Sequence, residues 1–313
     1  MTVTRSPAVA DATAGTRARA RSGGPLASER KWAWLFLAPT LIGLAVLSAG
    51  PILATLGISL TAWDLLTPAR WVGLDNFRDL LANDRFWTAL RNTAYYTIVS
   101  VPLGMALALA IALGLDRAIR GIAWIRTMYF LPLVTSSIAV GLVWLWIYAP
   151  TGGLLNEVLW WFRIPPHKWV SDPFWAMLAI IVMSVWQGLG VNIIIFLAGL
   201  QAIPQDYQDA ANVDGAGRWG RFRHITLPLL TPSIFFTGVL SLIGSLQVFD
   251  QVYVLSRPRP TEANLTLVYF IYEEGFRNFR MGSASAAAWI LFAIAALLTI
   301  VYFRSQKRWV HYQ

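Results

Sequence analysis

Six long stretches without Lys, Arg, Asp or Glu constrain the fold of this 313-residue chain more than any other feature of its sequence. They occupy residues 32–63, 92–115, 127–156, 173–205, 225–249 and 281–303. Each exceeds the roughly 20 residues that an α-helix needs to cross the hydrocarbon of a bilayer. Only 13% of the chain is charged and 57% is hydrophobic, whereas soluble domains carry about 25% charged residues. The pattern predicts an all-α polytopic membrane protein.

The predicted transmembrane domain covers residues 32–304, and we expect helices at about 32–61, 89–114, 125–148, 174–200, 230–255 and 281–304. The first run is much longer than the apolar region of about 7–15 residues in a signal peptide, so we expect an uncleaved span. Residues 1–31 predict a disordered basic tail, and residues 305–313 a short second tail. Six spans would place both tails on one side of the membrane.

The distribution of basic residues predicts which side that is. Fifteen Lys and Arg lie in the two tails and in the loops after the second and fourth runs, against ten elsewhere. The excess marks the fifteen-charge side as cytoplasmic. The net charge of +9 is explained by this asymmetry and by anionic lipid headgroups, so nucleic-acid binding is not expected.

Several kinds of chemistry have no matching residues. The chain has no Cys, and its three histidines, His167, His224 and His311, have no spacing suited to a metal site. It contains no GxxxxGK[ST] phosphate loop, so we expect no ATP bound by this chain. We find no nucleophile with a base on one membrane face, which argues against a membrane enzyme.

Residues 204–230 contain the polar interval between the fourth and fifth uncharged runs, and we call them the coupling loop. A helix is predicted after Pro204, with Asp206 and Asp209 in its opening turns, where the helix dipole favours acids. Gly215 and Gly217 would end it, and a second short segment would lead to the next span. The interval predicts helix, glycine break and helix.

The same interval resembles the cytoplasmic coupling loop of permease subunits in binding-protein-dependent ABC importers. The matching positions are Asp209, Ala210, Ala211, Asp214, Gly215, Ala216, Trp219, Phe222, Ile225, Leu227 and Pro228. That family usually has Glu where this chain has Asp209. The resemblance implies that Asp209 is a charged anchor for an ATPase subunit, that Ala210 and Ala211 form a close-fitting surface, and that Gly215 supplies a bend.

Two further regions are similar to the same family. Gly73-Leu74-x-Asn76-Phe77 resembles the entry to the permease core of sugar importers, and Phe77, Leu80, Leu81, Phe86 and Leu90 predict a short amphipathic helix at the outer surface. Residues 231–312 look like the first of the two permeases in importers of carbohydrates and glycerol phosphates. Arg257-Pro258-Arg259-Pro260 departs from the glycine-rich turn of many relatives.

The resemblance implies a type I ABC importer permease in a bacterial cytoplasmic membrane. Its partners would be a second homologous permease, two ATPase subunits that carry ATP and Mg, and an extracytoplasmic solute-binding protein. Its solute would be an oligosaccharide or a similar carbohydrate. The alternative is glycerol-3-phosphate or a glycerophosphodiester. A secondary solute carrier is a more distant alternative, because we see no internal repeats around midplane charges.

Two spans carry polar and small residues near their middles, which we interpret as a substrate pathway: Ser184, Gln187, Gly188, Asn192, Ser241, Gly244, Ser245 and Gln247. Small and hydroxyl residues permit either close helix packing or hydrogen bonds to a sugar, and both interpretations stay open. The spans contain almost no cations, which favours neutral sugars over phosphates.

Asp250 is an acid inside an apolar stretch, beside Gln251. A carboxylate there is costly unless it is paired or hydrated, so a functional role is the first hypothesis. We expect Asp250 near the outer end of its span, on a different face from Ser241 and Ser245. We therefore interpret Asp250 and Gln251 as a gate or a subunit-interface contact, and no second intramembrane carboxylate or lysine offers a proton relay.

Overall fold

The structure is a computed structural model that describes residues 27–116, 122–256 and 260–310, with side chains described from Trp32 onward and omitted for 122–126. The basic tail before residue 27, the arginines at 257 and 259, and His311 lie outside the described residues. The described chain divides into two units, up to Leu53 and from Ala54 onward, and each is treated by itself.

The first unit is a single helical rod. It consists of α1 (Ala27–Leu44), the π-helical turn η1 (Ala45–Ala49) and the beginning of α2 (Gly50–Ser59). None of the side chains from Trp32 to Leu53 is buried, and Trp32, Phe36 and Leu47 are among the most exposed. Such a surface matches hydrocarbon rather than water.

The second unit is built around two long helices, α4 (Asp84–Leu115) and α8 (Trp175–Gln201). Small residues such as Ala108 and Ala112 on α4 pack with Ile193 and Phe196 of α8 in one core cluster. A larger cluster contains Phe86, Ile180 and further buried residues of α13, α14 and α15. The 27 residues of α8 make it about 40 Å long, enough to cross a bilayer.

Shorter elements join these helices. The antiparallel strands β1 (Thr61–Ala62) and β2 (Arg70–Trp71) pair Thr61 with Trp71. The remaining helices of the first half are α3 (Asp75–Leu81), α5 (Ile122–Val134), α6 (Ser137–Ile147) and α7 (Leu154–Trp161). Those after α8 are α9 (Gln205–Val213), α10 (Arg218–Arg221), η2 (Phe222–Thr226), α11 (Leu227–Leu229), α12 (Thr231–Leu246), α13 (Asp250–Leu255), α14 (Leu267–Tyr272), η3 (Glu273–Arg277) and α15 (Met281–Gln306).

Among the described residues, four helices are long and apolar enough to cross a membrane: Trp32–Ser59, Asp84–Leu115, Trp175–Gln201 and Met281–Gln306. The number rises to six if each of two bent pairs counts as one span. One pair bends by 110° between Val134 and Ser137, and the other by 63° between Leu229 and Thr231.

Two predictions of continuous helices are wrong. The span expected at about 125–148 is divided into α5 and α6 by the bend at Thr135–Ser136. The span expected at about 230–255 stops at Leu246 and restarts as α13 at Asp250. Hydropathy alone does not reveal such breaks, because the residues at them are uncharged.

The amphipathic helix expected around residues 77–90 is also divided. It becomes α3 and the first turns of α4, because the Asn83 side chain caps α4 by accepting from the backbone N–H groups of Arg85 and Phe86 at 2.9 and 3.3 Å. Phe86 is fully buried in the core and Leu80 is 2% exposed, so these two apolar residues face the interior of the protein.

Polar contacts tie the start of α4 to the segment around α14. Arg85 Nη2 lies 2.7 Å from Glu273 Oε2, and the Glu273 side chain is 3% exposed. The Asn92 amide donates to the carbonyl oxygen of Leu265 at 3.0 Å, and the backbone N–H of Leu267 donates to Thr93 Oγ1 at 2.8 Å. These bonds hold the N-terminal end of α4.

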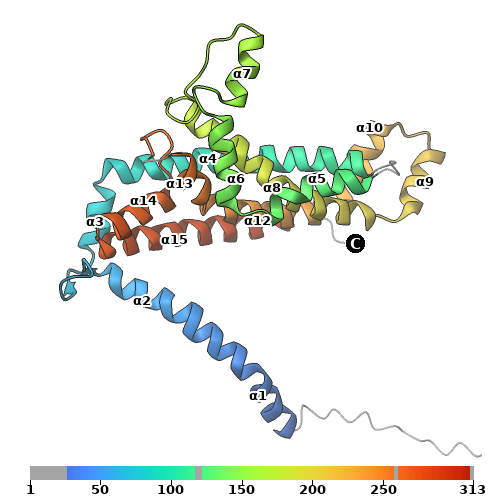
Figure 1. Cartoon of the computed structure of the whole chain (residues 1–313). Coiled ribbons are helices and arrows are strands. Elements are labelled where there is room, and N and C mark those ends of the chain that lie inside the picture. The colour runs from blue at the N-terminus through green and yellow to red at the C-terminus, as the bar shows by residue number, and fades with distance from the viewer. Residues whose placement is uncertain (1–26, 117–121, 257–259, 311–313) are drawn as a thin grey trace, which may run out of the picture. The chain divides into compact units, whose positions relative to one another are not determined.

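The segment containing α7 and the coupling loop lie at opposite ends of α8 (Figure 1). The Asn156 side chain orders the first of these segments, because its Oδ1 accepts from the indole N–H of Trp169 at 2.9 Å and from the backbone N–H of His167 at 3.1 Å. Trp169 also contacts Tyr148 and Trp175. The aromatic residues of this segment therefore belong to one packed cluster, from which Trp160 and Trp161 stand out at 71% and 74% exposure.

Candidate functional site: a polar cavity and the coupling loop

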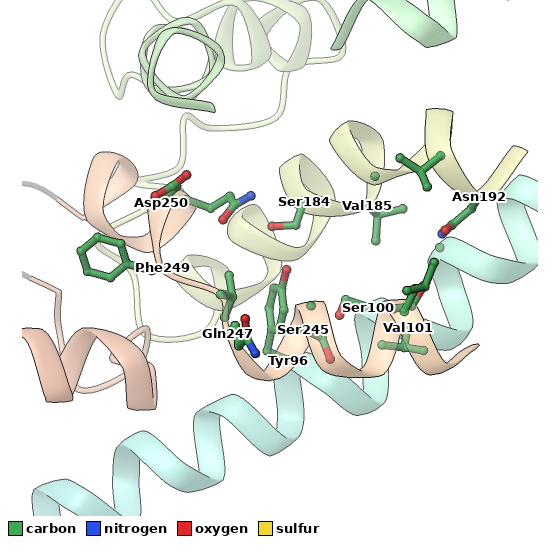
Figure 2. Close-up of a pocket in the computed structure, with 18 residues that line it drawn as sticks. Tyr96, Ser100, Val101, Ser184, Val185, Asn192, Ser245, Gln247, Phe249 and Asp250 are labelled. Carbon is green, nitrogen blue, oxygen red and sulfur yellow. The ribbon is translucent and has the colours of Figure 1, made fainter. Parts of the chain in front are cut away.

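A cavity of about 490 Å³ opens between α4, α8 and α12 and extends to the start of α13. Figure 2 shows the side chains of these helices directed toward one another around it. Ten of its 18 lining residues are Ser, Asn, Gln or Gly. The others are Val101, Val185, Val191, Leu240, Val248, Tyr96, Phe249 and Asp250, so the wall combines hydrogen-bonding groups with an apolar background. Among the described residues that line the cavity there is no Lys, Arg or His.

The structure brings most of the predicted pathway residues together. From two separate spans, the cavity wall includes Ser184, Gly188, Asn192, Ser241, Gly244, Ser245 and Gln247. This placement favours solute contact over helix packing as the role of these residues, because residues used only for packing would be covered by a neighbouring helix. Two serines are exceptions in part. Ser245 is 7% exposed and its hydroxyl donates to Leu242 O of its own helix at 2.8 Å, and the hydroxyl oxygen of Ser184 is buried.

Gln187 is the pathway residue that does not line the cavity. Its amide nitrogen donates to Ser137 Oγ at 3.1 Å, and its carbonyl oxygen accepts from Gln251 Nε2 at 3.0 Å. Gln187 therefore does not line the cavity itself, but it is bonded to Gln251, which does.

Asp250 and Gln251 lie on the same cavity as Ser241 and Ser245. The expectation that Asp250 faces another side is wrong, because that argument assumed a continuous helix. The break between Leu246 and Asp250 turns the chain, and Phe249 adopts φ −136° and ψ −56° there. The buried hydroxyl of Thr266 donates to the Val248 carbonyl at 3.2 Å, which satisfies one backbone group that the break releases.

Helix α4 contributes a wall of the cavity that was not predicted from the sequence. Tyr96, Ser100 and Gly104 line the cavity opposite α8, and the Tyr96 ring stands among Ser184, Gln247 and Ser245 (Figure 2). A signal was available, because these three residues recur every four positions and so share one face of a helix. That spacing could have identified α4 as a third wall.

The coupling loop at the other end of α8 has the predicted helix, glycine break and helix. Helix α9 ends at Val213, and Gly215 has φ +71°. The Gly215 N–H donates to Asn212 O at 3.1 Å and the Ala216 N–H to Ala211 O at 2.9 Å. This pair of bonds is the Schellman motif, which favours glycine because its left-handed conformation crowds a Cβ atom.

Contacts within the loop are local. The Arg221 guanidinium donates to the Asn212 side chain, and the rings of Trp219 and Phe222 lie 5.4 Å apart. The helix continues from α10 through η2 to Leu229 and then bends into α12. Ile225, Leu227 and Pro228 are half-buried in this continuation, so they support the loop and only part of their surface is accessible.

The exposed surface of the coupling loop contains all but one of the acidic and alanine residues expected there. Asp209, Ala210 and Asp214 are exposed, but Ala211 is 6% exposed. Ala211 is therefore part of the internal packing of α9, and the expectation that it forms an accessible docking surface is wrong for this structure. The outer surface has apolar side chains instead: Tyr207 at 49%, Val213 at 88% and Trp219 at 70% exposure.

Within the described residues no group of three or more His, Cys, Asp or Glu is arranged to hold a metal ion. The cavity has hydrogen-bonding groups without a nucleophile paired to a base. The long apolar helices around this cavity define a class of protein, a polytopic membrane protein with hydrogen-bonding groups in a cavity between its helices.

Comparison with known proteins identifies the family. Residues 100–311 match the family described as the binding-protein-dependent transport system inner membrane component. The chain belongs to this family and is thus the membrane permease subunit of an ABC importer. In this family ATP hydrolysis belongs to separate subunits, so the chain is not itself an enzyme.

Sequence relatives agree with this assignment. The chain is 38% identical over 285 residues to a probable ABC transporter permease protein of Bacillus subtilis, covering 90% of this chain and 92% of the relative. It is 36% identical to a lactose transport system permease protein of Rhizobium radiobacter, covering 86% and 91% of the two chains. It is 34% identical to an sn-glycerol-3-phosphate transport system permease protein of Agrobacterium fabrum, covering 78% and 83%.

Solved structures agree on the fold. A chain of a bacterial ABC transporter involved in the import of the acidic polysaccharide alginate aligns with a TM-score of 0.80 at 25% identity, covering 90% of this chain and 96% of that one. A chain of the bacterial alginate transporter in complex with its alginate pentasaccharide-bound periplasmic protein aligns with a TM-score of 0.81 at 24% identity, with the same coverage. The fold is therefore that of an ABC importer permease.

Proposed function

We propose that this chain forms one half of the solute path of a carbohydrate importer and that the cavity between α4, α8 and α12 is where it meets the solute. The observation that supports this most strongly is the composition of the wall, in which hydroxyl and amide groups stand beside the ring of Tyr96 and aliphatic side chains. Sugars present many hydroxyl groups and apolar ring faces, and such sites recognise them by a few placed hydrogen bonds on an apolar background.

The wall also favours an uncharged solute. A phosphate or carboxylate would gain from cations, but the described lining residues have none and include the carboxylate of Asp250. Asp250 would accept hydrogen bonds from solute hydroxyls at the α13 end of the cavity, with Gln251 beside it. This replaces the gate or interface role that the sequence suggested.

Glycerol-3-phosphate or a glycerophosphodiester is the second candidate solute, and the 34% identity to a glycerol-3-phosphate permease supports it. The two candidates are separated by uptake into proteoliposomes that contain the complete importer and its binding protein. We expect ATP-dependent uptake of trehalose, maltose or lactose that sn-glycerol-3-phosphate does not reduce. Uptake of sn-glycerol-3-phosphate alone would contradict the carbohydrate assignment.

A second homologous permease would close the cavity from the side that this chain leaves open. On α12, Leu240 lines the cavity and is 44% exposed, and Phe236 is 53% exposed. Apolar side chains at that position suit a helix of a neighbouring subunit, and the cavity between two such subunits would be enclosed. An extracytoplasmic solute-binding protein would deliver the solute to it.

The coupling loop would dock on an ATPase subunit, and the importer would contain two such subunits that carry ATP and Mg. Exposed Asp209 and Ala210 form part of the proposed contact, and the exposed apolar side chains of Tyr207, Val213 and Trp219 add an anchor. Asp214 at the end of α9 and the bend at Gly215 set the shape of this surface, while half-buried Ile225, Leu227 and Pro228 join it to α12.

This function requires six spans, both termini in the cytoplasm and a bacterial cytoplasmic membrane as the location. Because the chain has no Cys, single-cysteine variants test the topology without background. A membrane-impermeant maleimide should label Trp160→Cys on intact spheroplasts and Trp219→Cys only after lysis. Labelling of both from the same side would contradict the proposed topology.

A further inference from the structure

Gln187 lies behind the cavity wall and connects three parts of the chain. Its Nε2 donates to Ser137 Oγ at 3.1 Å, and its Oε1 accepts from Gln251 Nε2 at 3.0 Å. Ser137 is 50 positions away and Gln251 is 64 positions away. One side chain of α8 thus bonds to α6 and to α13 at the same time.

Both partners of Gln187 lie at breaks in the helical spans. Ser137 is the first residue of α6, directly after the 110° bend. Gln251 is the second residue of α13, directly after the interruption at 247–249. A break removes the backbone bonds that set the direction of a helix, so other contacts must fix the half-helix that follows.

The two half-helices α6 and α13 pack directly on each other. A Cβ atom added to Gly141 of α6 would lie 2.9 Å from Val254 Cγ1 of α13, so glycine permits this close approach. At its other end α6 is bonded to α8, since the Tyr148 hydroxyl donates to Ala179 O at 3.0 Å. The pair is therefore bonded to α8 near the outer end of α6 by Tyr148 and near the breaks by Gln187.

The bond to Gln187 also orients Gln251, which lines the cavity. With one N–H of the Gln251 amide bonded to Gln187, its carbonyl oxygen and second N–H are left to bond a solute. An amide held in one orientation binds a solute with less loss of entropy than one that rotates freely.

We propose that Gln187 is a positioning residue, which fixes the Gln251 amide at the cavity wall and holds α6 and α13 against α8, without touching the solute. The proposal deepens the proposed function and rests on it, because it concerns the same cavity. It gives Gln187 a role different from that of the lining residues Ser184 and Asn192.

The first test needs no solute. Val252 of α13 is fully buried, so a Val252→Cys variant reacts with a maleimide only when α13 opens, and the rate reports that opening. In the complete importer in detergent, adding Gln187→Leu should raise the labelling rate about 3- to 20-fold, as expected from interhelical hydrogen bonds in membranes.

Ser136→Ala is the matched control for this test. Ser136 lies at the same bend, is exposed, and its side chain makes no capping hydrogen bond, so the rate should not change. An unchanged rate with Gln187→Leu as well would overturn the proposal, whatever solute the importer carries.

The second test separates positioning from direct contact. In proteoliposomes with trehalose, maltose and lactose as probes, Gln187→Leu and Gln251→Leu should each raise KM with little change in maximal uptake. The double variant should resemble Gln251→Leu alone, because Gln187 acts through Gln251. Additive increases in KM would show that Gln187 contacts the solute and would overturn its positioning role.

Failure of the positioning role can be distinguished from failure of the proposed function. If none of the three sugars is taken up by the unmodified importer, the carbohydrate assignment fails, while the cysteine labelling still decides the role of Gln187. If uptake is normal and the labelling rate does not respond to Gln187→Leu, the positioning role fails and the carbohydrate assignment stands.

Discussion

The cavity and the coupling loop are both polar regions of a largely apolar chain, but they are held together in different ways. In the loop, hydrogen bonds join near neighbours, such as Gly215 to Asn212 and Ala216 to Ala211. Behind the cavity wall, Gln187 bonds to residues 50 and 64 positions away. The loop is a local structure, and the cavity exists only through tertiary packing.

This difference has a functional consequence. A loop that is folded by its own bonds can move and dock as one body. A cavity whose walls come from different spans changes shape when those spans shift. Movement at the loop would thus be converted into a change of the cavity through α12, which follows the loop and carries Ser241 and Ser245.

The largest effect is expected from removing the contact between Arg85 at the start of α4 and Glu273. Arg85→Ala would leave the 3% exposed Glu273 carboxylate without its partner at 2.7 Å. Because the Arg85 side chain is 35% exposed, the cost should lie below about 3–5 kcal/mol, which is the cost of breaking a fully buried pair. The thermal unfolding temperature of the purified importer should fall clearly. Arg78→Ala on α3 is the control, since Arg78 is exposed and forms no ion pair among the described residues. Equal unfolding temperatures for both variants would contradict the role of this contact.

The next effect concerns the bend in the loop. Gly215→Val places a β-branched residue at φ +71°, which costs about 1–3 kcal/mol of backbone strain. We expect loss of ATP-driven uptake while the chain still inserts into the membrane. Gly217→Ala is the control, because Gly217 has φ −67° and open space around an added Cβ. Normal uptake by Gly215→Val would show that the bend is dispensable.

A smaller effect is expected from the exposed acid of the loop. Asp209→Lys should weaken binding of the ATPase subunits about tenfold, because it replaces the proposed negatively charged anchor by a positive charge. Co-purification at increasing salt measures this. Gln205→Lys adds a positive charge to another exposed position of α9 and should have less effect. If the two variants behave alike, Asp209 has no special contact.

The smallest effect concerns one cavity group. Asn192→Leu removes a half-buried amide from the wall, and loss of one hydrogen bond should raise KM for sugar uptake about threefold. Val182→Ala, at an exposed position of α8 outside the cavity, should leave KM unchanged. An unaltered KM in Asn192→Leu would exclude that amide from solute recognition.

The same contrast explains what the sequence could predict. The coupling loop could be anticipated in detail, because Pro204, Gly215 and Gly217 act on their own neighbours and the apolar runs are continuous. Candidate pathway residues on α8 and α12 could be found for the same reason, since polar residues are conspicuous inside apolar spans.

The breaks in the spans and the partners of buried groups could not be predicted in this way. Pro132 and Thr135-Ser136-Ser137 stand at one bend, but they do not give its angle. The interruption before Asp250 has no charged residue or proline at 246–249 to mark it. The position of Asp250 on the cavity follows from that interruption. Glu273 could be seen as an acid in the sequence, but not that Arg85, 188 positions earlier, would be its partner.

The most direct test of the account is a cross-link between the coupling loop and a separate ATPase subunit. Val213 is 88% exposed at the end of α9, and Val213→Cys gives the cysteine-free chain one reactive position. In native membranes, a short photoactivated cross-linker on Cys at this position should yield an adduct with an ATPase subunit, identified by mass spectrometry, and its yield should change when ATP is added. Adducts with lipid alone, at a yield that ATP does not alter, would contradict the coupling of this loop to ATP hydrolysis.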